Sequence, residues 1–412
     1  MMRSLFSGVS GLKNHQTRMD VIGNNISNVN TTGFKSSRTT FADQLSQTLT
    51  GSSAPKANLG GVNAKQIGLG SSVASIDMIF TDGSVQSTGK NTDLCLSGNG
   101  LFVVKRGDQT YYTRDGAFEF DAAGNYVLPG SGLLVQGWMG AAGANGEWEI
   151  NTNAATTAIT IQAGQSMPAT ATTKATYSGN LDAENSTGAK ITTTVTAYDS
   201  QGFKYSVPLI FEKTGTNTWS VTAGTVAGAG SVNITGGSVS FTTVGVQPAS
   251  TTSSNASITI TSGAGTPLNI DLDLSSITQF ANESTVHAEN DGYTSGTLES
   301  ISIDSSGIIT GVYTNGERRQ EAQVAVAQFA NSTGLTKTGN SLYQESNNSG
   351  SANIKTASAL GVAITPSALE MSNVDVANEF ADMIITQRGF QSNSKIVTVG
   401  DEMLETVINM KR

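Results

Sequence analysis

The sequence predicts a multidomain protein of mixed class, with two mainly β domains between terminal α-helices that pair as a coiled-coil-like core domain. Apolar residues recur with heptad spacing near both chain ends, and strand and turn patterns fill the segments between them. The chain has 412 residues, more than one hydrophobic core usually organises, so we expect two to four domains.

The N-terminal segment predicts a helix over residues 4–28. Its heptad track is interrupted by Gln16 and Gly23. The polar stretch 28–33 is expected to end this helix, because Asn and Thr compete for backbone hydrogen bonds and Gly33 can adopt a left-handed conformation. The following Phe34 is a candidate anchor. The apolar members of the track are Leu5, Val9, Leu12, Met19 and Ile26.

The C-terminal segment predicts a second, longer helix with the same heptad spacing. Ser372 and Asp375 have the spacing of a capping box at its start. Lys411 and Arg412 place positive charge at its C-terminus, where the helix dipole favours it. Gly389 is expected to cost this helix about 1 kcal/mol relative to Ala. The apolar members of the track are Val376, Phe380, Met383, Phe390, Val397, Leu404 and Ile408; Gln387, Ser394 and Asp401 interrupt it.

The middle of the chain predicts β structure in two kinds of sequence. Residues 73–149 and 298–330 show clear strand and turn patterns, whereas residues 151–287 are rich in Thr, Ser and Gly. Residues 214–270 contain no charged residue, which favours a β-sandwich over disorder because disordered chains are usually highly charged. The apolar residues available for that sandwich are Trp219, Val221, Ile234, Phe241, Val244, Ile258 and Ile260.

The order of helix, β, different β, β and helix predicts nested domains. A chain that passes outward through layers and returns brings its termini together and builds each inner layer from two discontinuous segments. The expected division is a helical core domain of residues 1–33 and 372–412, a linker of 34–70, an inner β domain of 71–150 and 288–371, and an outer β domain of 151–287.

The composition argues against several classes of partner and cofactor. A net charge of −9 without clustered Lys and Arg argues against nucleic acid. The single cysteine, Cys95, excludes an intramolecular disulfide and is expected to be a buried strand residue. His15 and His287 lie far apart, so we expect no metal and no cofactor. No run of about 18 apolar residues predicts membrane insertion, and no apolar signal region precedes a cleavage site.

No set of nucleophile, base and acid stands out, so we expect no enzymatic activity. Residues 98–104 (GNGLFVV) lack the spacing and the following helix of a phosphate-binding loop, and predict a tight turn before a strand. A pair of carboxylates that hydrolyses glycans is expected to lie in a cleft lined by aromatic residues. The sequence shows no such aromatic pattern around the acidic pairs Asp271/Asp273 and Glu119/Asp121.

The two heptad tracks leave two interpretations open. They either form a helical hairpin that packs on its own domain, or they stay uncovered until many copies of the chain associate. We favour association, because the polar interruptions weaken a self-contained core and long exposed apolar stripes mark association sites. The twelve apolar residues of the two tracks are therefore the predicted assembly interface.

Both chain ends resemble the flagellar rod and hook protein family of bacteria. A further match over residues 81–138 resembles the β domain of that family, and a weaker match covers 197–219. The length of the chain and the insertion at 151–287 resemble its hook members more than its shorter rod members. The matching terminal stretches are SLFSGVSGL (4–12), DVIGNNISNVNTTGFKSSR (20–38), Phe41 and SNVDVANEFADMIITQRGFQSNSKIVTVGDEMLETVINMKR (372–412).

The resemblance implies a structural subunit of the flagellar hook, a flexible tubular homopolymer that transmits torque from rod to filament. The terminal helices would form the inner tube, with the β domains outside. It also implies a location outside the cell in the hook and basal body, reached through the flagellar type III export apparatus without a cleaved signal. Expected partners are further copies of the chain, the distal rod protein, the hook cap protein and the hook–filament junction protein.

Three alternatives remain open at this point. The distal rod protein of the same family is disfavoured by the insertion at 151–287. A surface β-sandwich adhesin is disfavoured by the paired terminal heptads, and a glycan-active enzyme by the missing cleft. Family members commonly carry Ala at the position of Cys95, and some crosslink neighbouring subunits through Cys and Lys, but no motif here places Cys95 in that role.

Overall fold

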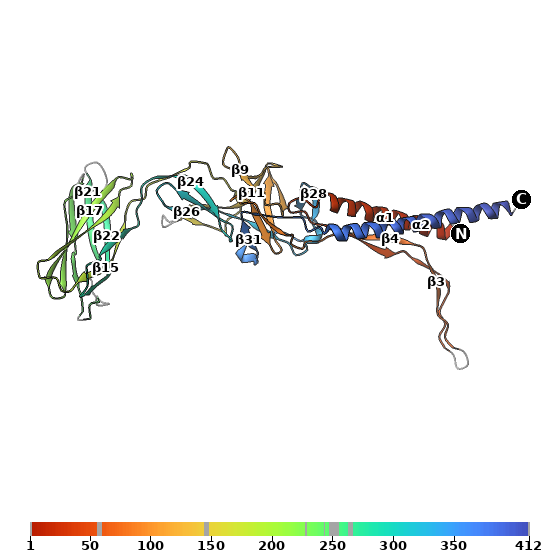
Figure 1. Cartoon of the computed structure of the whole chain (residues 1–412), viewed down its shortest axis with the longest axis horizontal. Coiled ribbons are helices and arrows are strands. Elements are labelled where there is room, and N and C mark those ends of the chain that lie inside the picture. Colours follow the sequence, from red (N-terminus) through yellow and green to blue (C-terminus); the bar gives the residue numbers. More distant parts are fainter. Residues whose placement is uncertain are drawn as a thin grey trace. The chain divides into compact units, whose positions relative to one another are not determined.

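The computed structural model describes residues 2–55, 60–143, 148–226, 229–242, 244–246, 255–262 and 267–410. It is mostly β, with one helix near each chain end and several sheets between them, which confirms the predicted mixed class (Figure 1). The chain divides into two compact units. Unit 1 comprises Met1–Gln162, Ile301–Thr310 and Gln320–Arg412, and unit 2 comprises Ala163–Ser300 and Gly311–Arg319.

The two helices of unit 1 are α1 (Met2–Ser27) and α2 (Val376–Asn409), and they lie side by side (Figure 1). The 34 residues of α2 give it a length of about 51 Å. The predicted end of the first helix is confirmed, because Gly33 has a φ of 63° in the left-handed region.

The start of α2 differs from the predicted capping box. Asp375 is the N-cap itself, and its Oδ1 accepts hydrogen bonds from the backbone N–H groups of Ala377 and Asn378 at 2.9 and 3.3 Å. The Ser372 hydroxyl instead accepts from the backbone N–H of Val374. A carboxylate at the N-cap satisfies two otherwise unpaired donors, so the helix begins three residues later than a box starting at Ser372 would require. The predicted charges at 411 and 412 lie outside the described residues.

An antiparallel hairpin arm follows α1. Its first three strands lie in residues 34–70, which were expected to form a linker, and its fourth strand begins the predicted inner β domain at Ser71. β1 pairs with β4 at its base, and β2 pairs with β3 further along. All residues of β2 and β3 are exposed. β-branched residues in both base strands, together with Phe41 in β1, favour this extended pairing. The strands of the arm are β1 (Ser37–Asp43), β2 (Ser46–Thr50), β3 (Lys65–Gly68) and β4 (Ser71–Met78).

The β part of unit 1 is built around β11, which pairs with both N-terminal and C-terminal strands. The neighbouring strands follow the order β26-β11-β7-β8-β29-β28. The expected tight turn at GNG joins β6 to β7, with Gly98 at a φ of 102°. The remaining strands of this part are β5 (Val85–Ser87), β6 (Leu94–Ser97), β7 (Leu101–Arg106), β8 (Gln109–Thr113), β9 (Glu119–Phe120), β10 (Tyr126–Leu128), β11 (Leu133–Ala142), β12 (Trp148–Ile150), β13 (Thr157–Ala158), β26 (Arg318–Val324), β27 (Val326–Gln328), β28 (Thr336–Gly339), β29 (Leu342–Gln344), β30 (Asn353–Lys355), β31 (Ala363–Pro366) and β32 (Ala368–Glu370).

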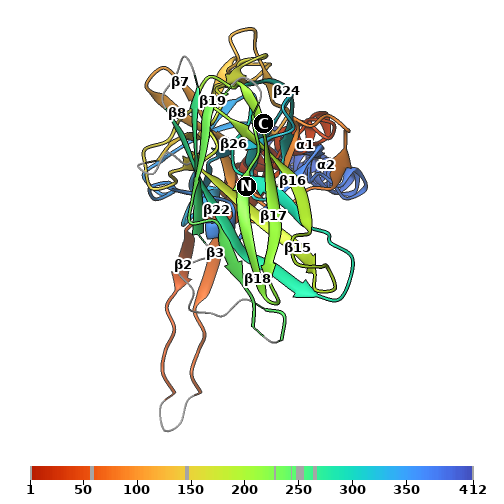
Figure 2. The same cartoon turned by 90° about the vertical axis from the view of Figure 1, so that its left-hand side faces the viewer.

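Unit 2 contains a five-stranded sheet in the order β19-β21-β22-β15-β23 and a four-stranded sheet in the order β16-β17-β18-β20 (Figure 2). The two sheets share one hydrophobic core, which confirms the predicted sandwich. The strands are β14 (Ser166–Met167), β15 (Lys174–Asp182), β16 (Lys190–Tyr198), β17 (Lys204–Gly215), β18 (Thr218–Ala223), β19 (Ala229–Thr235), β20 (Ser238–Ser240), β21 (Asn255–Ser262), β22 (Leu268–Phe280) and β23 (His287–Asn290). β24 (Gly296–Ile303) and β25 (Ile308–Tyr313) are divided between the units, and the first two residues of β26 also belong to unit 2.

The predicted core residues of the sandwich are correct with one exception. Val244 is 70% exposed, because it lies in a turn after β20 and outside both sheets. The residues that pack in or against the core as predicted are Trp219, Val221, Ile234, Phe241, Ile258 and Ile260.

Two asparagines, one buried and one half-buried, join the helices to the base of the hairpin arm. Asn25 at the end of α1 donates to the Ser37 carbonyl at 2.8 Å and to Glu379 Oε1 of α2 at 2.9 Å. Asn373 accepts from the Ser36 backbone N–H at 2.8 Å and donates to the Ile79 carbonyl at 2.7 Å. The polar turn after α1 is therefore a hydrogen-bonded junction between the two ends of the chain.

Candidate assembly interface

α1 and α2 contact each other in antiparallel orientation through glycines that admit side chains of the partner helix. A Cβ atom added at Gly400 would lie 2.7 Å from Leu5 Cδ2, and one at Gly8 would lie 3.4 Å from Val397 Cγ2. Further along the helices, a Cβ at Gly389 would lie 2.6 Å from the His15 ring. These glycines allow the two backbones to approach closely.

An ion pair between the C-terminal half of α1 and the N-terminal part of α2 also fixes how the two helices face each other. Arg18 Nη2 lies 3.0 Å from Asp382 Oδ2, and both side chains are partly exposed. Burial, and next the charge of Arg18, lowers the pKa of His15, so the imidazole favours its neutral form. The ring also makes an edge contact with Phe41 of β1 at a centroid distance of 6.2 Å. His15 therefore lies where α1, α2 and the arm meet.

The structure brings only part of the predicted interface together. Leu5 and Val397 lie at the contact between the helices. Half-buried positions are Leu12, Met19, Ile26, Val376, Met383 and Leu404, and exposed positions are Val9, Phe380, Phe390 and Ile408. Their role in assembly stays a prediction.

The heptad pattern did not identify the most buried face of α1. Ile22 is 3% exposed and Asn25 is 1% exposed, although neither belongs to the predicted track. Asn25 contacts both Ser37 of β1 and Glu379 of α2, so this face of α1 meets a strand as well as the partner helix. The spacing of three residues between Ile22 and Asn25 was the available signal, since such residues share one helix face.

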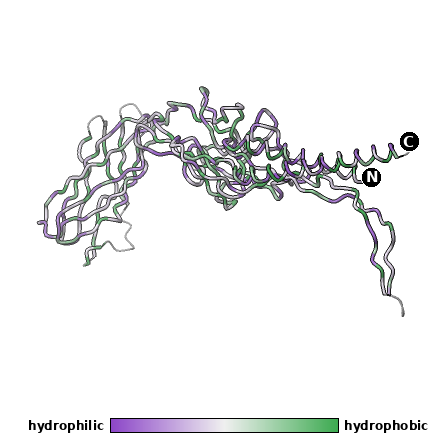
Figure 3. Tube along the Cα trace, turned by 45° about the vertical axis from the view of Figure 1, so that its right-hand side comes forward, coloured by the Kyte–Doolittle hydropathy of each residue, from purple (hydrophilic) through white to green (hydrophobic). Residues whose placement is uncertain are grey.

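α2 exposes an extensive apolar surface that no other part of the described chain covers. Within α2, all of which the structure describes, the buried residues are Thr386 and Gly400. Hydrophobic positions (green) recur along both helices in Figure 3. The exposed large apolar residues on α2 and directly after it are Phe380, Ile384, Ile385, Phe390, Ile396, Val399, Met403, Val407, Ile408 and Met410.

Three of the residues considered for chemistry are buried or engaged in local contacts. Burial, and next the charge of Glu370, raises the pKa of Cys95 to about 11, which disfavours a reactive thiolate. Asp121 accepts hydrogen bonds from the backbone N–H groups of its own turn, and Asp273 pairs with Lys174 at 3.0 Å. Among the described residues, no group of His, Cys, Asp and Glu has the arrangement of a metal site, and neither helix is long and apolar enough to cross a bilayer.

α2 thus presents an exposed apolar surface, whereas the two sheets of unit 2 enclose a hydrophobic core of their own. Four family models match the chain in order. They are described as flagella basal body rod protein (residues 5–35), flagellar hook protein FlgE/F/G D1 domain (95–165), flagellar basal body protein FlaE D2 domain (166–293) and flagellar basal body rod FlgEFG protein C-terminal (365–410).

Relatives align with the whole chain. The flagellar hook protein FlgE of Treponema pallidum is 43% identical and that of Borreliella burgdorferi is 40% identical, each over the full length of both chains. The chain therefore belongs to the flagellar hook protein family, which confirms the predicted family and the role of a structural subunit of the flagellar hook.

Two further similarities bear on the alternatives and the fold. The flagellar basal-body rod protein FlgG of Bacillus subtilis is 33% identical over the full length of both chains, less than the two hook proteins. The crystal structure of Helicobacter pylori flagellar hook protein FlgE2 matches 69% of this chain and all of its own, with a TM-score of 0.52 and 15% identity, and thus shares the fold.

Proposed function

We propose that this chain polymerises through α1 and α2 into the tubular flagellar hook and transmits torque from rod to filament as a flexible joint. One observation carries the proposal: α2 leaves large apolar side chains such as Ile384 and Ile385 more than half exposed. A long exposed apolar stripe is unfavourable in water and marks an association surface. Further copies of the same helix pair are the natural cover, because they present the same surface.

The finer organisation is part of the same proposal. The helices of residues 1–33 and 372–412 form a coiled-coil-like inner tube, and residues 34–70 connect it to an inner β domain of 71–150 and 288–371. The outer β domain of 151–287 stacks outside. The start of unit 2 at Ala163 and the match of the D2 model to residues 166–293 support an inserted outer domain.

Family membership supports the proposed partners and location. The assembled chain contacts the distal rod protein at one end, the hook–filament junction protein at the other, and the hook cap protein during growth. It reaches the outside of the cell through the flagellar type III export apparatus without a cleaved signal. A rod protein role is the second candidate, because a FlgG protein also aligns with the whole chain.

Electron microscopy of concentrated full-length protein beside a truncated chain of residues 34–371 tests the proposal. We expect tubes from the full chain and none from the truncated one. Tubes of equal number from both would contradict assembly through the helices. Added hook cap protein controls for a missing nucleus, and absence of tubes from the full chain even then would also contradict the proposal. Tubes that remain straight would favour the rod role.

A further inference from the structure

A cluster of buried charges lies where both chain ends enter the β part of unit 1. Lys35 follows the left-handed turn at Gly33, Arg114 follows β8, and Glu370 ends β32. Their side chains are 0%, 2% and 1% exposed. Charged side chains are almost never this buried unless they are paired, so this cluster needs a physical explanation.

Glu370 is the centre of the cluster. Its Oε1 accepts from Lys35 Nζ at 2.6 Å and from the backbone N–H of Gly83 at 2.8 Å. Its Oε2 lies 3.0 Å from Arg114 Nε. The other end of the guanidinium contacts Asp82 Oδ1 at 2.6 Å, so two positive and two negative charges are brought together.

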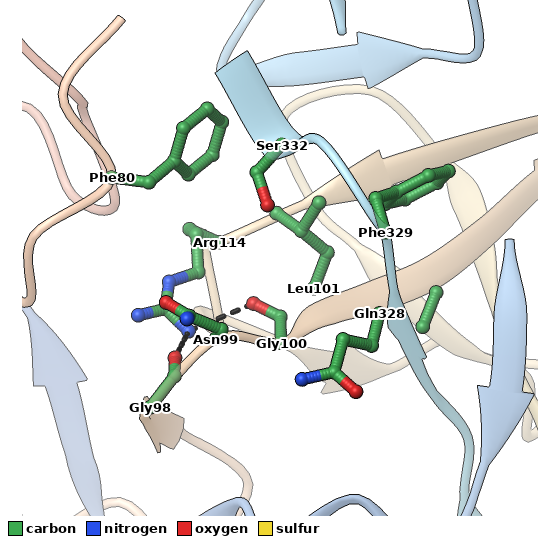
Figure 4. Close-up of a pocket in the computed structure, with 10 residues that line it drawn as sticks. Phe80, Gly98, Asn99, Gly100, Leu101, Arg114, Gln328, Phe329 and Ser332 are labelled. Atoms are coloured by element: carbon green, nitrogen blue, oxygen red, sulfur yellow. Dashed lines mark hydrogen bonds between the residues drawn. The ribbon is translucent and has the colours of Figure 1, made fainter. Parts of the chain in front are cut away.

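Backbone carbonyls accept hydrogen bonds from both cations. Lys35 Nζ also donates to the Thr81 carbonyl at 2.7 Å. Arg114 Nη1 donates to the carbonyls of Gly98 and Gly100, each at 2.8 Å, and Figure 4 shows the guanidinium directed at this turn. Burial, and next the charge of Arg114, lowers the pKa of Lys35, while the contact with Glu370 opposes this shift.

Gly33, two residues before Lys35, also holds the turn after α1 against Glu370 and Arg114. The backbone N–H of Gly33 donates to the Glu370 carbonyl at 2.8 Å. A Cβ atom at Gly33 would lie 2.6 Å from the backbone carbon of Arg114, which leaves no room for a side chain. The turn after α1 is therefore held against the same two residues by backbone and side-chain contacts.

Stability alone does not explain why these positions are charged. Apolar side chains of similar volume often stabilise a fold as well as a buried ion pair does. Charged partners differ in that they require one relative placement, because an unpaired buried charge is costly. Here the carboxylate of Glu370 lies beside the charges of both Lys35 and Arg114 only when the turn after α1, the end of β8 and β32 meet in this arrangement.

We propose that Lys35, Glu370 and Arg114 form a latch that sets the direction in which α1 and α2 leave the β part of unit 1. The significance of the latch rests on the proposed function, since copies that pack through their helices must all present them in the same pose. Lys35 and Glu370 are then positioning residues for assembly, although neither lies on the exposed apolar surface.

Distance measurements between spin labels on the unassembled full chain test the latch. Cysteines replace the exposed residues Lys13 of α1 and Gln109 of β8, in a Cys95→Ala background. We expect one narrow distance distribution with Glu370 present and loss of that single maximum in Glu370→Gln. The matched control is Glu119→Gln, which removes the half-exposed ion pair with Lys90 at 3.1 Å and is expected to leave the distribution narrow.

A second variant separates direction from stability. The double variant Lys35→Met with Glu370→Met removes one charge of each sign and fills the space with apolar side chains of similar volume. It replaces Glu370→Gln in the distance measurement if Glu370→Gln fails to fold. We expect near-normal thermal unfolding with a broad distribution. A narrow distance distribution in the folded double variant would overturn the latch. A broad distance distribution in the labelled chain that keeps Lys35 and Glu370 would also overturn it. Because the readout needs no polymer, absence of tubes from the unaltered chain would refute the proposed function separately.

Discussion

The core of unit 2 and the surface of α2 use the same kinds of apolar side chain in opposite ways. Phe211 and Trp219 are fully buried between the two sheets of unit 2. Ile384 and Ile385 of α2 are 58% and 60% exposed. Unit 2 therefore completes its core within one chain, whereas α2 leaves large apolar side chains exposed to water in the single chain. The difference separates residues that fold the subunit from residues that are expected to join subunits.

The largest expected effect comes from charges placed on the exposed apolar surface of α2. Ile384→Asp with Ile385→Asp is expected to abolish tube formation, because an unpaired charge buried at an interface costs about 3–5 kcal/mol. Thermal unfolding of unit 2 should not change. The matched control is Ser392→Asp, at an exposed polar position of the same helix. Light scattering and electron microscopy measure assembly, and normal tubes from the double variant would remove this surface from the interface.

The opposite result is expected in the core of unit 2. Phe211→Ala should lower the free energy of unfolding of this unit by about 3–5 kcal/mol, because a large buried ring is removed and a cavity remains. Phe203→Ala also deletes a phenyl ring, but at a position that is 62% exposed. This change should alter the free energy of unfolding of unit 2 by less than about 0.5 kcal/mol. Denaturant unfolding measures both. Equal effects of the two changes would contradict a closed core.

A third test concerns the contact between the helices. Gly389→Ala should destabilise the helix pair by about 1–3 kcal/mol, because the new methyl group would lie 2.6 Å from the His15 ring. Gly23→Ala meets no atom within 4 Å and should stabilise α1 by up to about 1 kcal/mol. Circular dichroism at 222 nm follows both variants. Stabilisation by Gly389→Ala would show that the glycine is not needed for close approach.

The smallest expected effect is a pH dependence of the helix pair. Burial, and next Arg18, lowers the pKa of His15 in the folded state, so the unfolded chain binds the proton more readily. This contribution to stability is complete above the unfolded pKa of about 6.5 and is lost as the pH falls through the lowered folded pKa. His15→Gln should therefore flatten the fall in helix melting temperature between pH 7.5 and pH 5.

The control for that titration is His287→Gln in unit 2, which should leave the pH dependence of the helix signal unchanged. An identical pH dependence in the unaltered chain and in His15→Gln would assign the effect to other groups. The groups facing His15 are Arg18 on its own helix, Gly389 on α2 and Phe41 on β1, and Asp382 pairs with Arg18.

The sequence by itself determined the local elements of this protein. Heptad spacing predicted both helices, the left-handed Gly33 ended the first, and apolar residues such as Trp219 predicted the sandwich of unit 2. Spacing and turn chemistry are properties of neighbouring residues, so they can be read from the chain directly. The same reasoning failed at Val244 and at the start of α2, where the exact end of an element decided the outcome.

Tertiary structure alone decided which parts of the chain meet. It brought Lys35 and Glu370 together across 335 positions of sequence, placed the His15 ring at Gly389, and selected the face of α1 that carries Ile22. It also turned the expected linker into a paired hairpin arm. These outcomes depend on contacts between distant segments, whose partners no local pattern specifies, and for that reason the charged latch is visible only in the folded chain.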